Sequence, residues 1–265
     1  MKISIFSCWD RRAWLHSRSI VLLQTCLWAL MVVAAAAAPP RLEQMFSGQW
    51  PEYARGDATD VVVVGNRAYV AFGYGGLLIL DISNPANPVR LGGCETGGYA
   101  RSVAVSGTVA YVADDWKGLQ IIDVSHPASP VRLARYDMEM AWSVAVSGTV
   151  ACVADYGVAR ELRIIDVSNP SHPVGLSSFA TAYPAVRVAV SGTVAYVAEA
   201  LYTDEGGNTA TDGCLEIIDI SNPSSPRLLS SPVGGAVLSV AVSGTVAYVT
   251  SEWYHPWPIF DSLRS

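Results

Sequence analysis

The feature that most constrains this chain is a ten-residue phrase, Val-Ala-Val-Ser-Gly-Thr-Val-Ala-Tyr-Val, that recurs almost verbatim. Its copies, the first of them looser, lie at residues 61–70, 103–112, 144–153, 188–197 and 240–249. A second phrase of the type Leu-Gln-Ile-Ile-Asp-Val-Ser follows four of them, at residues 78–83, 119–125, 162–168 and 215–221. Self-similarity of this kind indicates a repeat architecture, in which each unit packs against its neighbours.

The local chemistry of each repeat favours β-strands. Short runs rich in Val, Ile, Tyr and Ala alternate with turn residues, and no helix-length amphipathic segment follows the N-terminal stretch. Ser-Gly-Thr predicts a tight hairpin in which Gly107 takes a positive φ. The recurring acids before Ser and a proline predict backbone turns rather than catalysis; they are Asp81, Asp123, Asp166 and Asp219. With a fourth run such as residues 130–136, each repeat supplies four strands in about 42 residues, the size of a β-propeller blade.

These phrases resemble the LVIVD repeat of bacterial and archaeal cell-surface proteins. The likeness covers about residues 57–265. It implies a four-stranded repeat, an all-β propeller and an extracellular setting, and it implies no reaction. The last repeat departs from the pattern, because residues 257–262 are a degraded third strand and the chain then stops.

The repeats predict a propeller of about five four-stranded blades. The fifth repeat lacks a fourth strand, while residues 41–46 resemble the fourth-strand run at 132–136. We expect this N-terminal strand to pair with the last repeat, because an open ring leaves a strand edge and an apolar blade face exposed. An incomplete arc, or a chain that dimerises to complete its ring, is the alternative.

Residues 1–38 have the pattern of a signal peptide. Four basic residues precede an almost uncharged apolar run at 20–38, which ends in five alanines before Pro39. The run is also near the length of a membrane span, so an uncleaved N-terminal anchor is the alternative. Residues 39–56 form a lead-in with the closing strand, and the repeats are expected to be secreted, periplasmic or on the cell surface.

Net charge and cysteine usage limit the kinds of partner and metal that the chain is expected to bind. Residues 39–265 retain 13 of the 17 basic residues and 22 of the 23 acidic ones, a net charge of −9, which argues against nucleic acid. Their three cysteines, Cys94, Cys152 and Cys214, lack metal-ligand spacing and predict buried thiols, with a disulfide among them as the alternative. The sequence indicates no cofactor, and it predicts membrane contact only through an uncleaved N-terminal segment.

The spacing of the phrases locates a variable face. From hairpin glycine to the turn aspartate, successive repeats span 16, 16, 18, 27 and 17 residues, so the variation lies between the second and third strands. Those loops and the links between repeats open on the same face, which is where binding residues are usually found. The candidate ligand-binding residues on it are acidic, aromatic or basic: Asp60, Arg101, Asp114, Asp115, Trp116, Trp142, Asp155, Tyr156, Arg187, Glu199 and Trp253.

Around a central funnel, such groups suit a carbohydrate, a cationic group or a peptide. The structural alternative is that the acids cap strand ends and the aromatics cover the blade tops. We predict an exported binding or scaffold module for a surface glycan, peptide or partner protein. The alternatives are a polysaccharide hydrolase or lyase that uses Asp114, Asp155 or Glu199, and a purely structural repeat.

The long loop of the fourth repeat is rich in oxygen ligands. Asp204, Glu205, Asn208 and Asp212 are a weak candidate for calcium, since their spacing differs from that of the helix-flanked calcium loop. A solvated loop without an ion is the simpler interpretation.

Overall fold

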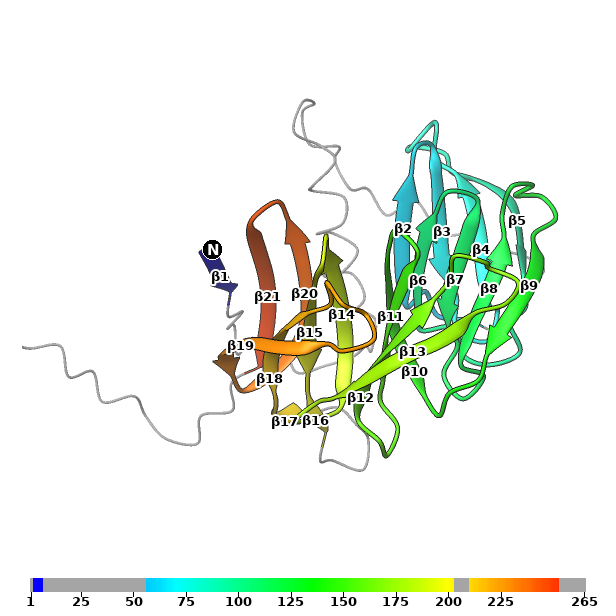
Figure 1. Ribbon diagram of the computed structural model, residues 1–265. Helices are drawn as coiled ribbons and strands as arrows, with labels where there is room; N and C mark the ends of the chain where they lie inside the picture. Colours follow the sequence, from blue (N-terminus) through cyan, green and yellow to red (C-terminus); the bar gives the residue numbers. More distant parts are fainter. Residues whose placement is uncertain (1, 7–55, 203–209, 253–265) are drawn as a thin grey trace, which may run out of the picture.

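The computed structural model describes residues 2–6, 56–202 and 210–252, and every regular element in these ranges is a β-strand (Figure 1). The all-β class predicted from the repeats is confirmed. The described residues include no helix that is long and apolar enough to cross a membrane. Apart from residues 2–6, the predicted leader lies outside the described ranges.

Four of the sheets are antiparallel, contain four strands each, and correspond to the first four repeats, here called blades 1 to 4. Blade 1 contains β2 (Asp60–Val64), β3 (Arg67–Ala71), β4 (Leu77–Asp81) and β5 (Val89–Cys94). Blade 2 contains β6 (Ser102–Ser106), β7 (Val109–Ala113), β8 (Leu119–Asp123) and β9 (Val131–Tyr136). Blade 3 contains β10 (Ala141–Ser147), β11 (Val150–Asp155), β12 (Glu161–Asp166) and β13 (Val174–Ala180). Blade 4 contains β14 (Ala185–Ser191), β15 (Val194–Glu199), β18 (Cys214–Asp219) and β19 (Arg227–Gly234).

The fifth repeat forms a smaller sheet, here called blade 5. Its strands β20 (Ala236–Ser243) and β21 (Val246–Glu252) are antiparallel. The other edge of β21 pairs in parallel with β1 (Lys2–Phe6), so residues assigned by sequence to the leader lie where other blades have an antiparallel third strand. The predicted closing segment at 41–46 and the degraded strand at 257–262 lie outside the described residues.

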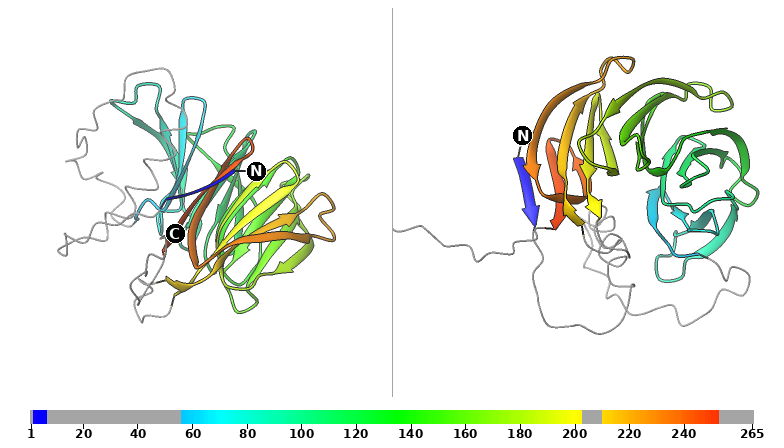
Figure 2. Two further views of the ribbon diagram at one scale, coloured as in Figure 1. Left: turned by 90° about the vertical axis from the view of Figure 1, so that its left-hand side faces the viewer. Right: turned by 90° about the horizontal axis from the view of Figure 1, so that it is seen from below.

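The blades follow one another round an arc in chain order (Figure 2). The first strands of successive blades contact each other, from β2 through β6, β10 and β14 to β20. Consecutive blades are also joined by a repeated hydrogen bond. The backbone N–H of the first Val in the Val-Ala-Val segment donates to a side-chain oxygen of the residue that precedes this segment in the blade before it. The bonds run from Val103 N to Asp60 Oδ2, from Val144 N to Ser102 Oγ, and from Val188 N to Ser143 Oγ. The first strands are therefore innermost, as in a propeller.

The core lies between the blades. On β7, Tyr111 and Ala113 belong to the buried cluster shared with blade 3, whereas Ala110 and Val112 belong to the cluster shared with blade 1. Because successive side chains of a strand point to opposite faces, both faces of this strand are buried by neighbouring blades. A blade that lies between two others therefore depends on both neighbours to bury its apolar surface.

The predicted turns are confirmed. Gly107 has a φ of 59°, in the left-handed region that a hairpin of this kind requires. Asp123 Oδ1 accepts a hydrogen bond from Ser125 N at 2.8 Å. The same bond forms in blades 1, 3 and 4, from Ser83 to Asp81, from Ser168 to Asp166 and from Ser221 to Asp219. These four aspartates hold turns, and hydrogen bonds from the side chain and the backbone N–H of the same serine lower the pKa of each carboxyl.

Candidate ligand-binding site

A pocket of about 160 Å³ lies where the first strands of the five blades converge. Five of its lining residues occupy the same position of the repeat, two residues before the Val-Ala-Val segment: Thr59, Arg101, Trp142, Val186 and Leu238. Arg187 and Tyr202 complete the lining. Since every repeat contributes its equivalent residue, the pocket lies on the axis round which the blades are arranged.

Three of these axial residues are positioned by breaks in strand register. The pairing of first and second strands shifts between Ala141 and Ser143 in blade 3, and the same shift brackets Val186 in blade 4 and Leu238 in blade 5. A bulge adds one residue to a strand and redirects its side chain. It accounts for three adjacent blades presenting the residue at this position to the pocket.

Arg101 lies at the centre of a stack of rings. Its guanidinium carbon is 3.5 Å from the centroid of the Trp142 ring and 5.1 Å from that of Tyr99. Trp142 also stacks on Tyr156, with centroids 4.3 Å apart. The faces of Trp142 are thus occupied by Arg101 and Tyr156, so the indole does not offer a free face to a ligand.

Both pocket arginines are paired with carboxylates. Arg101 donates from Nε to Asp115 Oδ2 at 2.8 Å, and its Nη2 lies 2.7 Å from the same oxygen. Arg187 Nη1 donates to Asp60 Oδ2 at 3.2 Å, which joins blade 4 to blade 1. An arginine has five N–H donors, so each of these ion pairs leaves some guanidinium N–H groups that it does not use.

An exposed aromatic cluster adjoins this stack. Trp116 and Tyr74 are 51% and 59% exposed, and their ring centroids are 6.4 Å apart. Tyr74 meets Tyr99 edge to face at 4.9 Å, and Tyr99 in turn lies under Arg101. We call Tyr74, Tyr99 and Trp116 the aromatic rim. It is a surface on which a flat apolar face can stack, next to the axial pocket.

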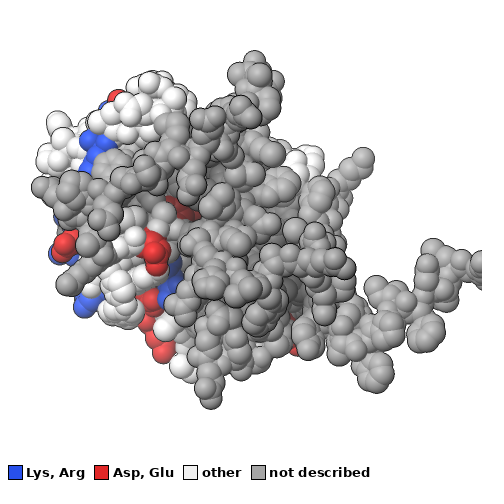
Figure 3. Space-filling view, turned by 180° about the vertical axis from the view of Figure 1, so that it is seen from behind, with Lys and Arg blue, Asp and Glu red and all other residues white. Residues whose placement is uncertain are grey.

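The charges of the surface are mixed. In Figure 3, which shows the side opposite to that of Figure 1, acidic and basic side chains lie next to each other on the part not covered by grey atoms. A polyanion is bound by a contiguous basic surface, which this visible part of the described residues does not present.

Three candidate binding acids do not line this pocket. Asp114 directly follows the second strand of its blade, and Asp155 and Glu199 are the last residues of theirs. All three are 0% exposed and absent from the pocket lining. Each accepts a hydrogen bond from the link that enters its own blade: Thr96 Oγ1 to Asp114, Met140 N to Asp155, and Tyr183 N to Glu199. They fix the links to the strand ends, which is the structural alternative stated above.

The buried acids differ in their electrostatics. Burial raises the pKa of Asp114 to about 6, even though Thr96 donates to its Oδ1 at 2.6 Å. Asp155 Oδ2 has the Nε of Arg163 4.0 Å away. Burial is also the main cause that raises the pKa of Glu199, followed by the adjacent Glu216 carboxyl. Of these acids, only Asp155 has a cationic side chain within ion-pair distance among the described residues.

The long loop begins and ends as a short hairpin formed by β16 (Leu201–Tyr202) and β17 (Ala210–Asp212). Asp212 accepts hydrogen bonds from Tyr183 Oη at 3.0 Å and from Gly213 N. The other calcium candidates, Asp204, Glu205 and Asn208, lie outside the described residues, as does Trp253. Cys94, Cys152 and Cys214 are free thiols, and the latter two are buried.

The structure therefore brings together seven of the candidates around the axis or its rim: Asp60, Arg101, Asp115, Trp116, Trp142, Tyr156 and Arg187. Sequence reasoning missed Thr59, Val186, Leu238 and Tyr202 in the lining, and Tyr74 and Tyr99 in the rim. A signal for Tyr74 existed, because it aligns with Trp116 in the repeat.

Comparison with known proteins decides the family. The model of the LVIVD repeat matches residues 55–96, 97–138, 139–181 and 209–232. The chain belongs to the LVIVD repeat family. The first three matched segments correspond to blades 1 to 3, and the fourth covers β18 and most of β19 in blade 4. No curated protein shows significant similarity to this LVIVD-repeat chain.

Solved structures share the fold of this LVIVD-repeat chain at low sequence identity. A functionally unknown protein from Desulfotomaculum acetoxidans is 16% identical with a TM-score of 0.57, over 74% of this chain and 63% of that one. The computationally designed protein Ika8 is 11% identical with a TM-score of 0.56, over 73% of this chain and 55% of that one. The matched region thus spans less than two thirds of either protein. At such identities the likeness concerns the fold alone.

Proposed function

We propose that the chain is an exported binding module whose axial pocket and aromatic rim hold the end of a surface glycan. The observation that carries the proposal is the convergence of one repeat position from all five repeats on a pocket with two arginines. A concave site on the axis of a rigid repeat scaffold, with a few polar groups directed into it, is where a ligand is expected.

The size and chemistry of the site favour a carbohydrate end group. A volume of about 160 Å³ is below the roughly 300–1,000 Å³ of sites for whole small molecules, so the pocket suits one terminal residue. The remaining N–H groups of Arg101 and Arg187 suit hydroxyl or carboxylate acceptors. Trp116 offers an exposed ring on which the apolar face of an adjoining sugar can stack.

The same geometry favours binding over hydrolysis. A glycosidase needs two carboxyl groups that reach the scissile bond from both sides. The three acids considered for that role are fully buried, belong to different blades, and are engaged by their own links. A peptide or protein ligand, and a purely structural role, remain the alternatives that an experiment has to separate.

The test is a binding screen of the purified protein against neutral and acidic oligosaccharides and short peptides. Leu238→Trp fills the pocket from a half-buried position and is expected to abolish binding. Trp116→Ala removes the exposed ring and is expected to weaken affinity by about tenfold, or about 1.4 kcal/mol. Val158→Ala, at an exposed loop position of blade 3, is the control that keeps affinity unchanged.

Each result has a definite meaning. Glycan binding that is lost in Leu238→Trp and weakened in Trp116→Ala supports the proposal. Binding that persists unchanged in both variants refutes the axial site, and selective binding of peptides refutes the glycan. Absence of any ligand in a broad screen favours the structural role.

A further inference from the structure

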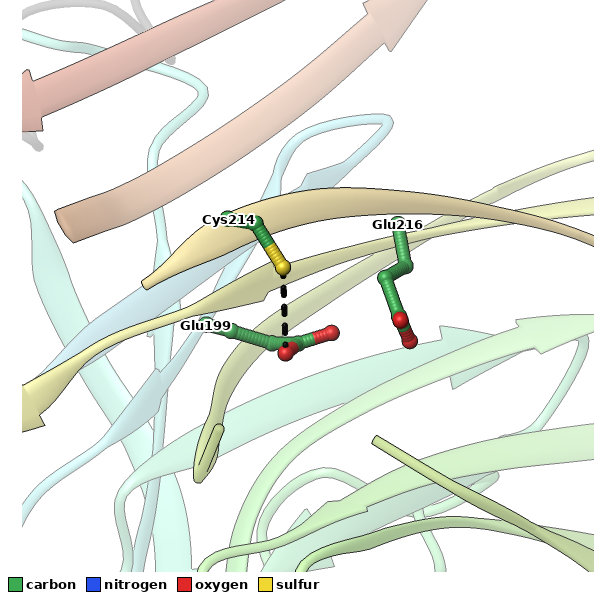
Figure 4. A group of neighbouring side chains, drawn as sticks. All are labelled: Glu199, Cys214 and Glu216. Carbon is green, nitrogen blue, oxygen red and sulfur yellow. Dashed lines mark hydrogen bonds between the residues drawn. The ribbon is translucent and has the colours of Figure 1, made fainter. Parts of the chain in front are cut away.

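A second cluster of chemically reactive side chains lies inside blade 4, away from the pocket lining. Glu199 ends β15, while Cys214 and Glu216 lie on the neighbouring strand β18, and all three are buried (Figure 4). One thiol and two carboxylate oxygens lie within 4.8 Å of one another. Cys214 Sγ donates to Glu199 Oε2 at 3.4 Å.

The two carboxylates of this cluster are incompletely satisfied. Glu199 is 0% and Glu216 6% exposed, and Glu199 Oε1 and Glu216 Oε2 have no hydrogen-bond partner among the described residues. In Figure 4 the Glu199 side chain, below the Cys214 sulfur, extends toward the carboxyl group of Glu216. Two buried carboxylates at such a place are unfavourable unless a proton or a cation lies with them.

The other blades show what usually occupies this place. Glu216 pairs with Val197, two residues before Glu199, and Arg163 pairs with Val153, two residues before Asp155. The equivalent position holds Gln120 in blade 2 and Leu78 in blade 1. Blade 3 thus places a cation beside its buried acid, whereas blade 4 has a second acid and, among the described residues, no cationic side chain paired with either glutamate.

We infer that Glu199, Cys214 and Glu216 bind one zinc ion. A thiolate with carboxylates is a donor set that selects zinc over calcium or magnesium, which prefer oxygen ligands alone. Zinc bonds of about 2.3 Å to sulfur and about 2.0 Å to oxygen at a tetrahedral angle place the two ligand atoms about 3.5 Å apart. The Cys214 Sγ to Glu199 Oε2 separation of 3.4 Å matches that geometry.

The ion has a structural consequence. Glu199 and Cys214 flank the hairpin formed by β16 and β17, from which Tyr202 contributes to the axial pocket. Zinc bound by both residues joins the two ends of the insertion at its base. It displaces the thiol proton of Cys214 and supplies the positive charge that Arg163 supplies in blade 3.

The experiment measures metal binding directly. The purified chain is stripped with a chelator and titrated with Zn²⁺ in competition with a chromophoric chelator, and its metal content is determined by mass spectrometry. Co²⁺ is substituted to detect the sulfur-to-metal absorption band. We expect one zinc ion per chain, a raised melting temperature on binding, and a thiolate band with Co²⁺.

The variants are matched to the repeats. Glu216→Gln reproduces Gln120 of blade 2 and is expected to weaken zinc affinity by at least about 100-fold, since loss of even an indirect ligand contact costs about 10–100-fold. Glu216→Arg reproduces the acid–arginine pair of blade 3 and is expected to fold without zinc. Cys214→Ser abolishes the cobalt thiolate band, whereas Cys152→Ser, at a buried thiol outside the cluster, retains it.

Failure of the stripped protein to take up zinc overturns the inference, because the two glutamates then share a proton instead. Uptake that is unchanged in Cys214→Ser and Glu216→Gln also overturns it. Loss of zinc with retention of the fold in Glu216→Arg separates metal binding from misfolding.

Discussion

The buried carboxylate of Asp114 makes the stability of this protein depend on pH in a way that a single substitution can isolate. Asp114 is 0% exposed, its Oδ1 accepts a hydrogen bond from Thr96 Oγ1, and its Oδ2 has no partner among the described residues. Burial raises its pKa from 3.8 to about 6. The folded state therefore holds the proton more tightly than the unfolded state does.

The sign and size of the effect follow from that difference. Where the native state binds more protons than the unfolded state, stability falls as pH rises, here between about pH 4 and pH 6. A difference of about two pKa units corresponds to about 3 kcal/mol once the carboxyl is ionised in both states. Asp114→Asn removes the charge and keeps an oxygen for Thr96.

We expect Asp114→Asn to unfold with a free energy about 1–3 kcal/mol higher than the wild type at pH 8, and nearly equal at pH 4. For a domain of this size the melting temperature rises by roughly 2–4 °C per kcal/mol. The measurement is urea unfolding of both proteins from pH 4 to pH 8. Groups that are present in both proteins titrate alike, so their contribution cancels when one free energy of unfolding is subtracted from the other.

Asp155→Asn is the matched control in the next blade. Asp155 Oδ1 accepts hydrogen bonds from Met140 N and Gly157 N, and Arg163 lies beside its Oδ2. Neutralising this acid weakens its hydrogen bonds to two backbone N–H groups and removes the charge beside Arg163, although Arg163 keeps its ion pair with Glu161. The variant is therefore expected to lose stability at pH 8. If Asp114→Asn is destabilised at pH 8, or if its difference from the wild type does not vary with pH, the electrostatic reasoning is refuted.

Three further predictions concern stability. Ile121→Ala, in the core between blades 2 and 3, is expected to lower the free energy of unfolding by about 2–5 kcal/mol, whereas Val131→Ala at an exposed strand position changes it little; urea unfolding measures both. Gly107→Ala places a side chain at positive φ in open space and is expected to cost about 1–2 kcal/mol. Gly118→Ala is expected to cost more in the same assay, because its Cβ would approach the Tyr136 carbonyl oxygen, and equal costs would contradict the geometry. Asp60→Ala removes the carboxylate that accepts hydrogen bonds from blades 2 and 4. It is expected to lower the free energy of unfolding by about 1–3 kcal/mol, measured by thermal unfolding, and an unchanged value would show that this contact does not contribute to stability.

The repeat and its turns could be predicted from the sequence because they depend on local chemistry repeated several times. The Ser-Gly-Thr hairpin requires a positive φ that Gly107 provides, and Asp123 forms its turn bond within two residues. Neither depends on how the blades pack.

The axial residues were only partly predictable. Selecting charged and aromatic residues near the links identified Arg101, Trp142 and Arg187 of the pocket lining. It missed Thr59, Val186 and Leu238, which occupy the repeated axial position. The bulges at the start of the first strands cause this error in part. A shift of one residue exchanges the face to which a side chain points, and sequence alone does not indicate where the register breaks.

The acids at the ends of the second strands show a different limit of prediction from sequence. The sequence left open whether a carboxylate at a strand end reaches into the funnel or caps the strand. In the structure the links that enter blades 2, 3 and 4 bring donors from Thr96, Met140 and Tyr183 to these carboxylates, and this depends on contacts between segments far apart along the chain. The local sequence contains no signal of such contacts.

The repeats also serve as internal controls for one another. At one pair of diagonally related positions, where the third-strand residue pairs two residues before the second-strand one, the same scaffold holds four combinations: Phe72 with Leu78, Asp114 with Gln120, Asp155 with Arg163, and Glu199 with Glu216. Because blades with apolar, amide and cationic partners all adopt the same strand pairing, the fold does not dictate the residues at these positions. The charge balance is then a property of each blade, and among the described blades the fourth is the one that places two buried acids next to each other. Such an imbalance, within a scaffold that accommodates alternatives, points to a bound cation more strongly than a buried acid in an unrepeated fold would.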